Sequence, residues 1–159
     1  MTRAGAPGAA SEGAGRQRSC HRVVNPEGLA PPVGFAHAVV AAPGRTVYLG
    51  GQTAQGPDGG IVGATLAEQF DRAAANLVAA LAAAGCAPEH LVSLHIYTTE
   101  VDLYRATRAQ LGAIYRRHLG HHYVATALFE VAGLFDPVAK VELVGIAVLP
   151  DPDPDREEP

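Results

Sequence analysis

The chain has 159 residues and a formal net charge of −4. This length fits one domain with a sizeable core, and the acidic balance argues against a nucleic-acid partner. No apolar segment approaches the roughly 20 residues that span a bilayer, so no membrane partner is expected. The N-terminus carries no apolar signal segment, and two cysteines make no disulfide framework. A cytoplasmic protein is the expectation.

Composition divides the chain into a body and two tails. Residues 1–20 are rich in Gly, Ala, Ser and Arg without periodicity, which predicts a disordered N-terminal extension. Residues 151–159 form an acidic tail interrupted by prolines, which predicts no regular element. The folded domain is therefore expected over residues 21–150.

The first half of the body predicts two strands and a helix. Strands are expected over residues 36–42 and 46–50, joined as a hairpin by a tight turn at residues 43–45. Thr65 and Glu68 match a capping box. A stripe of apolar residues at helical spacing follows, and Gly85 ends it: Leu66, Phe70, Ala74, Leu77, Leu81.

The second half predicts a strand over residues 91–98, with Leu91, Ser93, His95 and Tyr97 on one face. A helix is expected from near residue 102 to Gly120, then strands within residues 123–134 and over residues 138–149. This order indicates a two-layer α+β domain with two helices on one face of a mixed sheet. Because the strands are apolar on both faces, a partner subunit is expected to cover the other face.

The apolar stretch over residues 123–134 contains a carboxylate, and it has the length of one buried strand. Alternation places Thr126, Leu128 and Glu130 on one face. A buried unpaired charge is costly, so Glu130 is either a pocket acid, one half of an ion pair, or a residue at a strand end near water. For Glu142, the alternatives are a pocket acid or a surface pair with Lys140.

Several segments, in order and spacing, resemble the RidA/YjgF family of reactive-intermediate deaminases. Residues 34–39 (GFAHAV) are similar to the family's G-P-Y-S-x-A-V, and residues 48–52 (YLGGQ) to its S-G-Q. Residues 130–132 (EVA) and 141–143 (VEL) match two later strands. The resemblance implies a chorismate-mutase-like fold and a homotrimer whose sheets form a central barrel, with small-molecule pockets between subunits and no cofactor.

The same resemblance implies hydrolysis of imines and enamines such as 2-aminoacrylate, with a strand arginine that anchors the substrate carboxylate. That arginine's position is Thr126 here, and the family's pocket Cys and Tyr fall on Leu128 and Phe35. The Ser before G-Q falls on Gly50, and the acid linked to the water falls on Val144. The departures predict a divergent member that is not the standard 2-aminoacrylate deaminase.

Two classes of function follow. The first is a hydrolase or tautomerase for an imine, enamine or related carbonyl compound, with water addition assisted by Glu130 or Glu142 and the substrate polarised by backbone groups of residues 50–52. The second is a non-catalytic ligand-binding or chaperone-like trimer. Substrate-binding roles are predicted for eight residues: Phe35, His37, Gly50, Gln52, Tyr97, Thr126, Leu128, Val144.

The histidines carry weaker predictions. A single His within a strand, such as His37 or His95, is more often packed or solvent-facing than catalytic. His118, His121 and His122 are close in sequence, but no acid or Cys nearby completes a four-ligand set. We therefore expect no metal site, and we interpret them as cations at a helix C-terminus.

Overall fold

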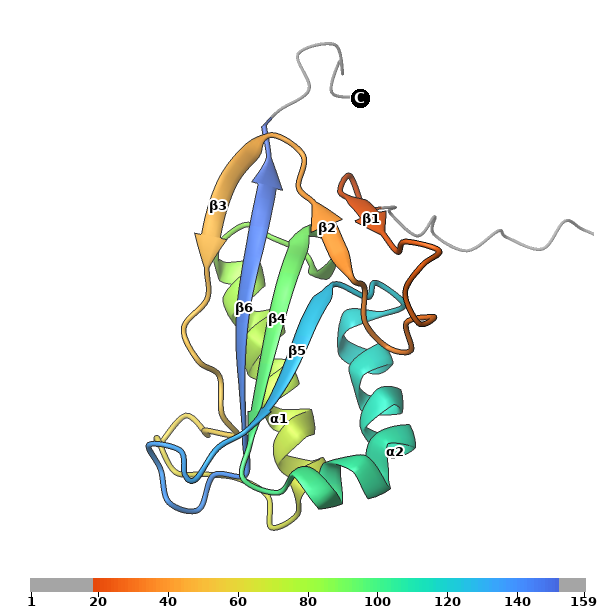
Figure 1. The fold of residues 1–159 in the computed structure, drawn as a ribbon. Helices are drawn as coiled ribbons and strands as arrows, with labels where there is room; N and C mark the ends of the chain where they lie inside the picture. Colours follow the sequence, from red (N-terminus) through yellow and green to blue (C-terminus); the bar gives the residue numbers. More distant parts are fainter. Residues whose placement is uncertain (1–18, 152–159) are drawn as a thin grey trace, which may run out of the picture.

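The computed structural model describes residues 19–151 (Figure 1). The elements follow in this order: β1 (Arg22–Val24), β2 (Ala38–Val40), β3 (Gly44–Tyr48), α1 (Leu66–Ala83), the short 3-10 helix η1 (Pro88–His90), β4 (Leu91–Thr98), α2 (Val101–Leu119), β5 (Ala125–Glu130) and β6 (Val141–Pro150). Within residues 19–151, no helix is both long enough and apolar enough to cross a bilayer. Residues 1–18 and 152–159 lie outside the described residues, so the two tails and the domain boundaries stay predictions.

Four strands form one mixed sheet in the order β3-β6-β4-β5. β4 and β5 run parallel, whereas β6 is antiparallel to both β3 and β4. Figure 1 shows α1 and α2 together on one face of this sheet, and the short pair β1 and β2 lies beside it. The predicted two-layer α+β arrangement is therefore confirmed.

Helix α1 has the boundaries that its sequence predicts. The Glu68 amide donates to Thr65 Oγ1 at 3.2 Å, and the Thr65 amide donates to Glu68 Oε2 at 2.9 Å, which completes the capping box. Gly85 follows the helix with a φ of 75°, a conformation that costs other residues more than glycine. The predicted apolar stripe is buried against the sheet: Leu66, Phe70, Ala74, Leu77, Leu81.

Helix α1 approaches β6 closely at Gly145. A Cβ added at Gly145 would lie 3.0 Å from a methyl carbon of Leu49 and 3.4 Å from one of Leu77. Val141, Leu143 and Ala147 point to the same side and are fully buried. The core therefore occupies the layer between the sheet and the helices. The alternate residues of β6 point to the opposite face of the sheet, which the helices do not cover.

The predicted hairpin over residues 36–50 is wrong. β2 pairs with β1, and β3 pairs with β6, so the two strands do not pair with each other. The amide of Ala42 donates to the buried His21 ring at 3.1 Å, which directs the chain between β2 and β3 away from a tight turn. Gly44 begins β3 rather than forming a turn, because a residue without a Cβ fits against the Leu149 backbone of β6.

Two other strand predictions need correction. The last strand begins at Val141 and not at Val138, because the amides of Val138 and Ala139 bond to Asp136 and the amide of Lys140 bonds to Gln69 Oε1. In β4, the register shifts between Leu91 and Ser93. This irregularity turns Leu91 into the core, away from the face that simple alternation gave it.

β5 is not the fully buried strand that its apolar sequence predicts. It is the edge strand of the sheet, and its side chains are half-buried at the start and exposed from Leu128 to Glu130. Phe129 stacks on Tyr97 with ring centroids 5.4 Å apart, on the sheet face that the helices leave open. An apolar, aromatic edge strand beside an open face favours a further layer of protein there.

Candidate functional site

A groove of about 750 Å³ lies between α2 and the strand β5. Phe35, Thr126 and Leu128, three of the residues predicted to bind substrate, line this groove. Ile96 of β4 and Phe70 of α1 also reach it from the core. Three of the side chains that the sequence predicts to bind substrate therefore share one groove, and the sequence did not indicate that α2 forms the other wall.

The helix wall combines small residues with arginines. Ala109 and Gly112 line the groove, and they leave room that longer side chains would fill. Arg105, Arg108 and Arg116 line it as well. These arginines were missed in the sequence analysis. Arg108 follows Arg105 by three positions and Arg116 follows Arg108 by eight, and these intervals place all three along one side of a helix.

The hydroxyl groups of the groove are partly committed to the backbone. Thr126 Oγ1 donates to the Val124 carbonyl at 3.0 Å, and the Tyr115 hydroxyl donates to the His122 carbonyl at 2.7 Å. Burial raises the pKa of Tyr104 to about 12 and also raises the pKa of Tyr115. Both phenols therefore stay protonated at neutral pH, and they do not act as bases there. Among the described residues, no carboxylate lines this groove.

The remaining predicted residues lie elsewhere, and most of them lie on the open face of the sheet. Tyr97 pairs with Glu142 across β4 and β6, and His95 pairs with Val144. Glu142 is half-buried, and its side chain lies over Gly51, where an added Cβ would overlap the carboxylate. This face therefore holds one carboxylate among mostly apolar and aromatic side chains.

The segment of residues 50–52 follows β3 beside Glu142. The Gln52 amide donates to the Leu143 carbonyl at 2.8 Å, and the Leu143 amide donates to the Gln52 carbonyl at 2.9 Å. The Gln52 side-chain amide donates to the Gly50 carbonyl at 3.0 Å. Because the Gln52 backbone amide is already used, the predicted polarising role of this segment is left to Gly50 and Gly51.

The two predicted acids have different surroundings. Glu130 is exposed at the end of β5, the setting of a strand end near water, whereas Glu142 is half-buried. The suggested pair between Lys140 and Glu142 is wrong, because Lys140 Nζ bonds to Glu100 Oε1. Glu142 is thus the acid that the fold holds against a backbone segment.

Of the two histidines predicted within strands, His95 lies in β4, whereas His37 lies just before β2, which begins at Ala38. His37 Nε2 lies 2.9 Å from the Ala30 carbonyl, its amide donates to Asn25 Oδ1 at 3.0 Å, and its ring meets Phe35 edge to face. His37 therefore holds the loop that carries Phe35, and it is not among the residues that line the groove. His95 lies edge-on to Phe129, with ring centroids 5.9 Å apart.

The histidines at the end of α2 and just after it make separate contacts. His118 Nε2 lies 2.5 Å from Asp71 Oδ1, and Arg117 bonds to the same carboxylate of α1. His122 Nε2 lies 2.8 Å from the Leu91 carbonyl. Among residues 19–151, no group of three or more His, Cys, Asp or Glu side chains is placed to hold a metal ion.

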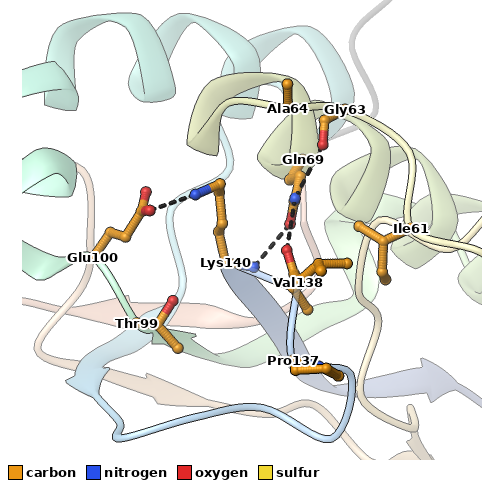
Figure 2. A pocket seen from close by; sticks show the side chains of 10 residues that line it. Ile61, Gly63, Ala64, Gln69, Thr99, Glu100, Pro137, Val138 and Lys140 are labelled. Atoms are coloured by element: carbon orange, nitrogen blue, oxygen red, sulfur yellow. Dashed lines mark hydrogen bonds and ion pairs between the residues drawn. The ribbon is translucent and has the colours of Figure 1, made fainter.

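A second cavity, of about 390 Å³, lies where the loop before β6 meets the start of α1 (Figure 2). Gln69 is fully buried there, and its amide donates to the Gly63 and Val138 carbonyls, each at 3.1 Å. Lys140 points to Glu100, whose Oε2 atom is buried without a hydrogen-bond partner among the described residues. This network joins the start of α1, the loop before β6 and the residue before α2. Its polar groups nearly all bond to one another, so we interpret it as structural and not as a ligand site.

The positions from the sequence analysis thus form two groups. Phe35, Thr126 and Leu128 line the groove beside α2, whereas Tyr97, Glu142 and Val144 belong to the opposite side of the sheet, where Gly51 lies against Glu142. Strand alternation separates them, since neighbouring residues of one strand point to opposite faces. A single copy of the chain therefore does not bring the predicted pocket together.

Comparison with known proteins gives a consistent result. The family model described as endoribonuclease L-PSP matches residues 27–149. The structure resembles a protein of the conserved Rid family, YyfB from Yersinia pestis, with 34% identity, a TM-score of 0.74, and coverage of 81% of this chain and 98% of that one. No curated protein sequence matches the chain.

Two further structures show the same likeness. A member of the YjgF/YER057c/UK114 family from Mycobacterium tuberculosis is 26% identical, with a TM-score of 0.56 and coverage of 74% of this chain and 88% of that one. The Rid-family protein YyfA from Yersinia pestis is 25% identical, with a TM-score of 0.58 and coverage of 82% and 100%. The match over residues 27–149 and the 34% identity show that this chain belongs to the RidA/YjgF family.

Proposed function

We propose that the protein is a Rid-family enzyme that hydrolyses or tautomerises an imine, an enamine or a related carbonyl-derived metabolite. The observation that carries this proposal is Glu142, a half-buried carboxylate held over Gly51 on a sheet face of mostly apolar side chains. A carboxylate within hydrogen-bond reach of a bound water can act as a general base toward it. The proposal needs no cofactor.

The site is shared between copies of the chain in this proposal. The groove and Glu142 lie on opposite sides of one sheet, so a ligand in the groove meets Glu142 only if the carboxylate comes from another copy. The exposed apolar edge strand β5 and the open face beside it supply surfaces for such contacts. The assembly proposed is a homotrimer with one cleft between each pair of neighbouring copies.

The chemistry follows from these positions. Water adds to the carbon of a C=N bond while Glu142 takes one of its protons, and the nitrogen gains a proton. The resulting carbinolamine then loses ammonia or an amine and becomes a carbonyl compound. In this proposal the backbone amides of Gly50 and Gly51 bind the polarised atom, and the contact between Gly51 and Glu142 supports a site beside this segment.

The small substrate 2-aminoacrylate is not expected to be the natural one. Its carboxylate needs a charged anchor on the strand wall, but Thr126 offers a neutral hydroxyl that already donates to the Val124 carbonyl. We expect pyruvate to be released from 2-aminoacrylate far more slowly than by a relative with an arginine at this position. Comparable rates in a coupled pyruvate assay would contradict this part of the proposal.

The test of the catalytic role is a panel of imines and enamines assayed for ammonia or carbonyl release. On any substrate that turns over, Glu142→Gln should lower kcat by about 100-fold or more, the usual contribution of a general base. Glu130→Gln decides between the two acids, because only the variant of the true base should lose kcat. Glu27→Gln, at an exposed position, is the control and should keep the wild-type kcat. Unchanged kcat in the Glu142 variant would refute the assignment.

A non-catalytic ligand-binding trimer is the second candidate, because no carboxylate among residues 19–151 of the single chain lines the groove. Ligands that raise the melting temperature without any turnover across the panel would favour it.

A further inference from the structure

The groove beside β5 carries a concentration of positive charge that the overall composition hides. The chain has a formal net charge of −4, yet Arg105, Arg108 and Arg116 of α2 all line this groove. Three guanidinium groups along one helix face repel one another, unless acids or a bound anion lie between them.

The acids in the described part of the chain do not neutralise all three arginines. Arg105 bonds to Asp102 at 2.9 Å, in a pair whose side chains are 70% and 95% exposed and therefore contribute little. Neither Arg108 nor Arg116 makes an ion pair with any residue in the part of the chain that the structure describes. Two positive groups at this groove thus have no counter-charge among residues 19–151.

The backbone of α2 helps to place one of these groups. A Cβ added at Gly112 would lie 3.4 Å from Nη1 of Arg116, so the guanidinium extends back along the helix over the glycine. A larger residue at position 112 would occupy the groove beside that guanidinium. The opposite wall is apolar where Phe35 and Leu128 line it, and Leu128 is 39% exposed in the single chain.

We propose that Arg108 and Arg116 form the anion anchor of this groove, and that its ligand is an organic acid whose apolar body separates the carboxylate from the other end of the molecule. A guanidinium binds a carboxylate through two parallel N–H···O bonds, whereas the strand wall offers no charge. The carboxylate lies on the α2 wall, and the apolar body packs on Phe35 and Leu128. An acid as short as a three-carbon one cannot occupy both walls.

This inference rests on the groove being the ligand site of the proposed function, but it does not require turnover. The probes are 3-phenylpropanoate and its neutral isostere 3-phenylpropanamide, with pyruvate as the short acid. Isothermal titration calorimetry at low ionic strength measures the affinity of the full chain for each probe. Low salt is needed because screening weakens partly exposed charge pairs.

The expected result is at least ten-fold tighter binding of 3-phenylpropanoate than of the amide or of pyruvate. The double variant Arg108→Gln/Arg116→Gln should remove the preference for the acid over the amide and leave the amide affinity within two-fold. Arg22→Gln, which removes an exposed arginine of β1 that does not line the groove, should keep the preference.

Equal affinities for acid and amide, absence of saturable acid binding, or an unchanged acid preference in the double variant would each overturn the inference. Failure of the proposed function looks different. If the acid preference is present and depends on the two arginines while the imine panel shows no turnover, the anchor stands and the enzyme proposal fails. If the wild type and the double variant turn over neutral imines equally, and neither binds 3-phenylpropanoate more tightly than its amide, the enzyme proposal stands and the anchor fails.

Discussion

Gly51 and Glu142 are in such close contact that a side chain at position 51 would have to displace the Glu142 carboxylate. A Cβ added at Gly51 would lie 2.7 Å from Cδ of Glu142 and would overlap Oε1. Gly51 has no positive φ, so its conformation does not demand glycine, and the close approach of the carboxylate does. The proposed general base therefore lies directly over the segment that follows β3.

Gly51→Ala should therefore displace the Glu142 carboxylate without straining the backbone. A misplacement of about 1 Å in a catalytic group lowers rates by up to about 100-fold, so a loss of about 10-fold to 100-fold in kcat is expected. The measurement is steady-state kinetics with a substrate from the imine panel. Gly28→Ala is the matched control, because nothing lies within 4 Å of its added Cβ. Equal kcat values for the two variants would argue against a positioned carboxylate.

Lys140→Met should destabilise the fold by leaving Glu100 without its partner. The two side chains are 27% and 30% exposed, and Glu100 Oε2 is already buried without a hydrogen bond among the described residues. We expect a loss of about 1–2 kcal/mol in urea unfolding, less than for a fully buried pair. The double variant Lys140→Met/Glu100→Gln should recover part of the loss. A double variant less stable than the single one would show that the pair is not coupled.

Gln69→Met should cost more, because Gln69 joins α1 to two other segments. The substitution leaves the Lys140 amide and the Gly63 and Val138 carbonyls without their partner. Unsatisfied buried groups cost roughly 1–3 kcal/mol each, so a loss of about 3 kcal/mol is expected after partial relaxation. Gln55→Met, at an exposed position, should stay within about 0.5 kcal/mol. Similar stabilities for the two variants would contradict the role of this network.

Asp71 should make stability depend on acid pH. Hydrogen bonds from His118 and Arg117 lower the pKa of its carboxyl below the ordinary value of 3.8. A lowered folded-state pKa contributes stability that is present above the unfolded pKa and is lost as pH falls through the folded pKa. The stability difference between the wild type and Asp71→Asn should therefore be larger at pH 6 than at pH 3. Denaturant midpoints at the two pH values measure it, and a difference that grows on acidification would contradict the assignment.

Local sequence signals predicted the helices well and the sheet less well. The capping box at Thr65 and the glycines after both helices depend on neighbouring residues, so they could be found from the sequence. Pairing of β3 with β6 joins residues about a hundred positions apart, and no local pattern records it. The register shift at Leu91 likewise depends on β6, and it changed which face that residue occupies.

The candidate site could be predicted only in part. The resemblance placed Phe35, Thr126 and Leu128, and the structure brings these three to one groove. The arginines of α2 were missed because charged residues on a helix usually face solvent, and only the neighbouring strand shows that these line a groove. The pairing of Lys140 with Glu100 was missed for a similar reason, since their partnership crosses from one loop to another.

The central claim is that the groove of one copy and Glu142 of another form one site, and subunit mixing tests it directly. Glu142→Gln removes the base, and Gly112→Phe places a ring in the groove next to Arg116. Each variant alone should be inactive on the imine panel. The two proteins are unfolded together in equal amounts, refolded, and assayed as trimers confirmed by light scattering.

Random assembly pairs an intact groove with an intact Glu142 from the next copy in about a quarter of the clefts. The account therefore predicts that mixed trimers regain roughly a quarter of wild-type activity. Trimers that stay inactive after mixing, although refolded wild type is fully active, or a light-scattering mass of a stable monomer, would contradict it.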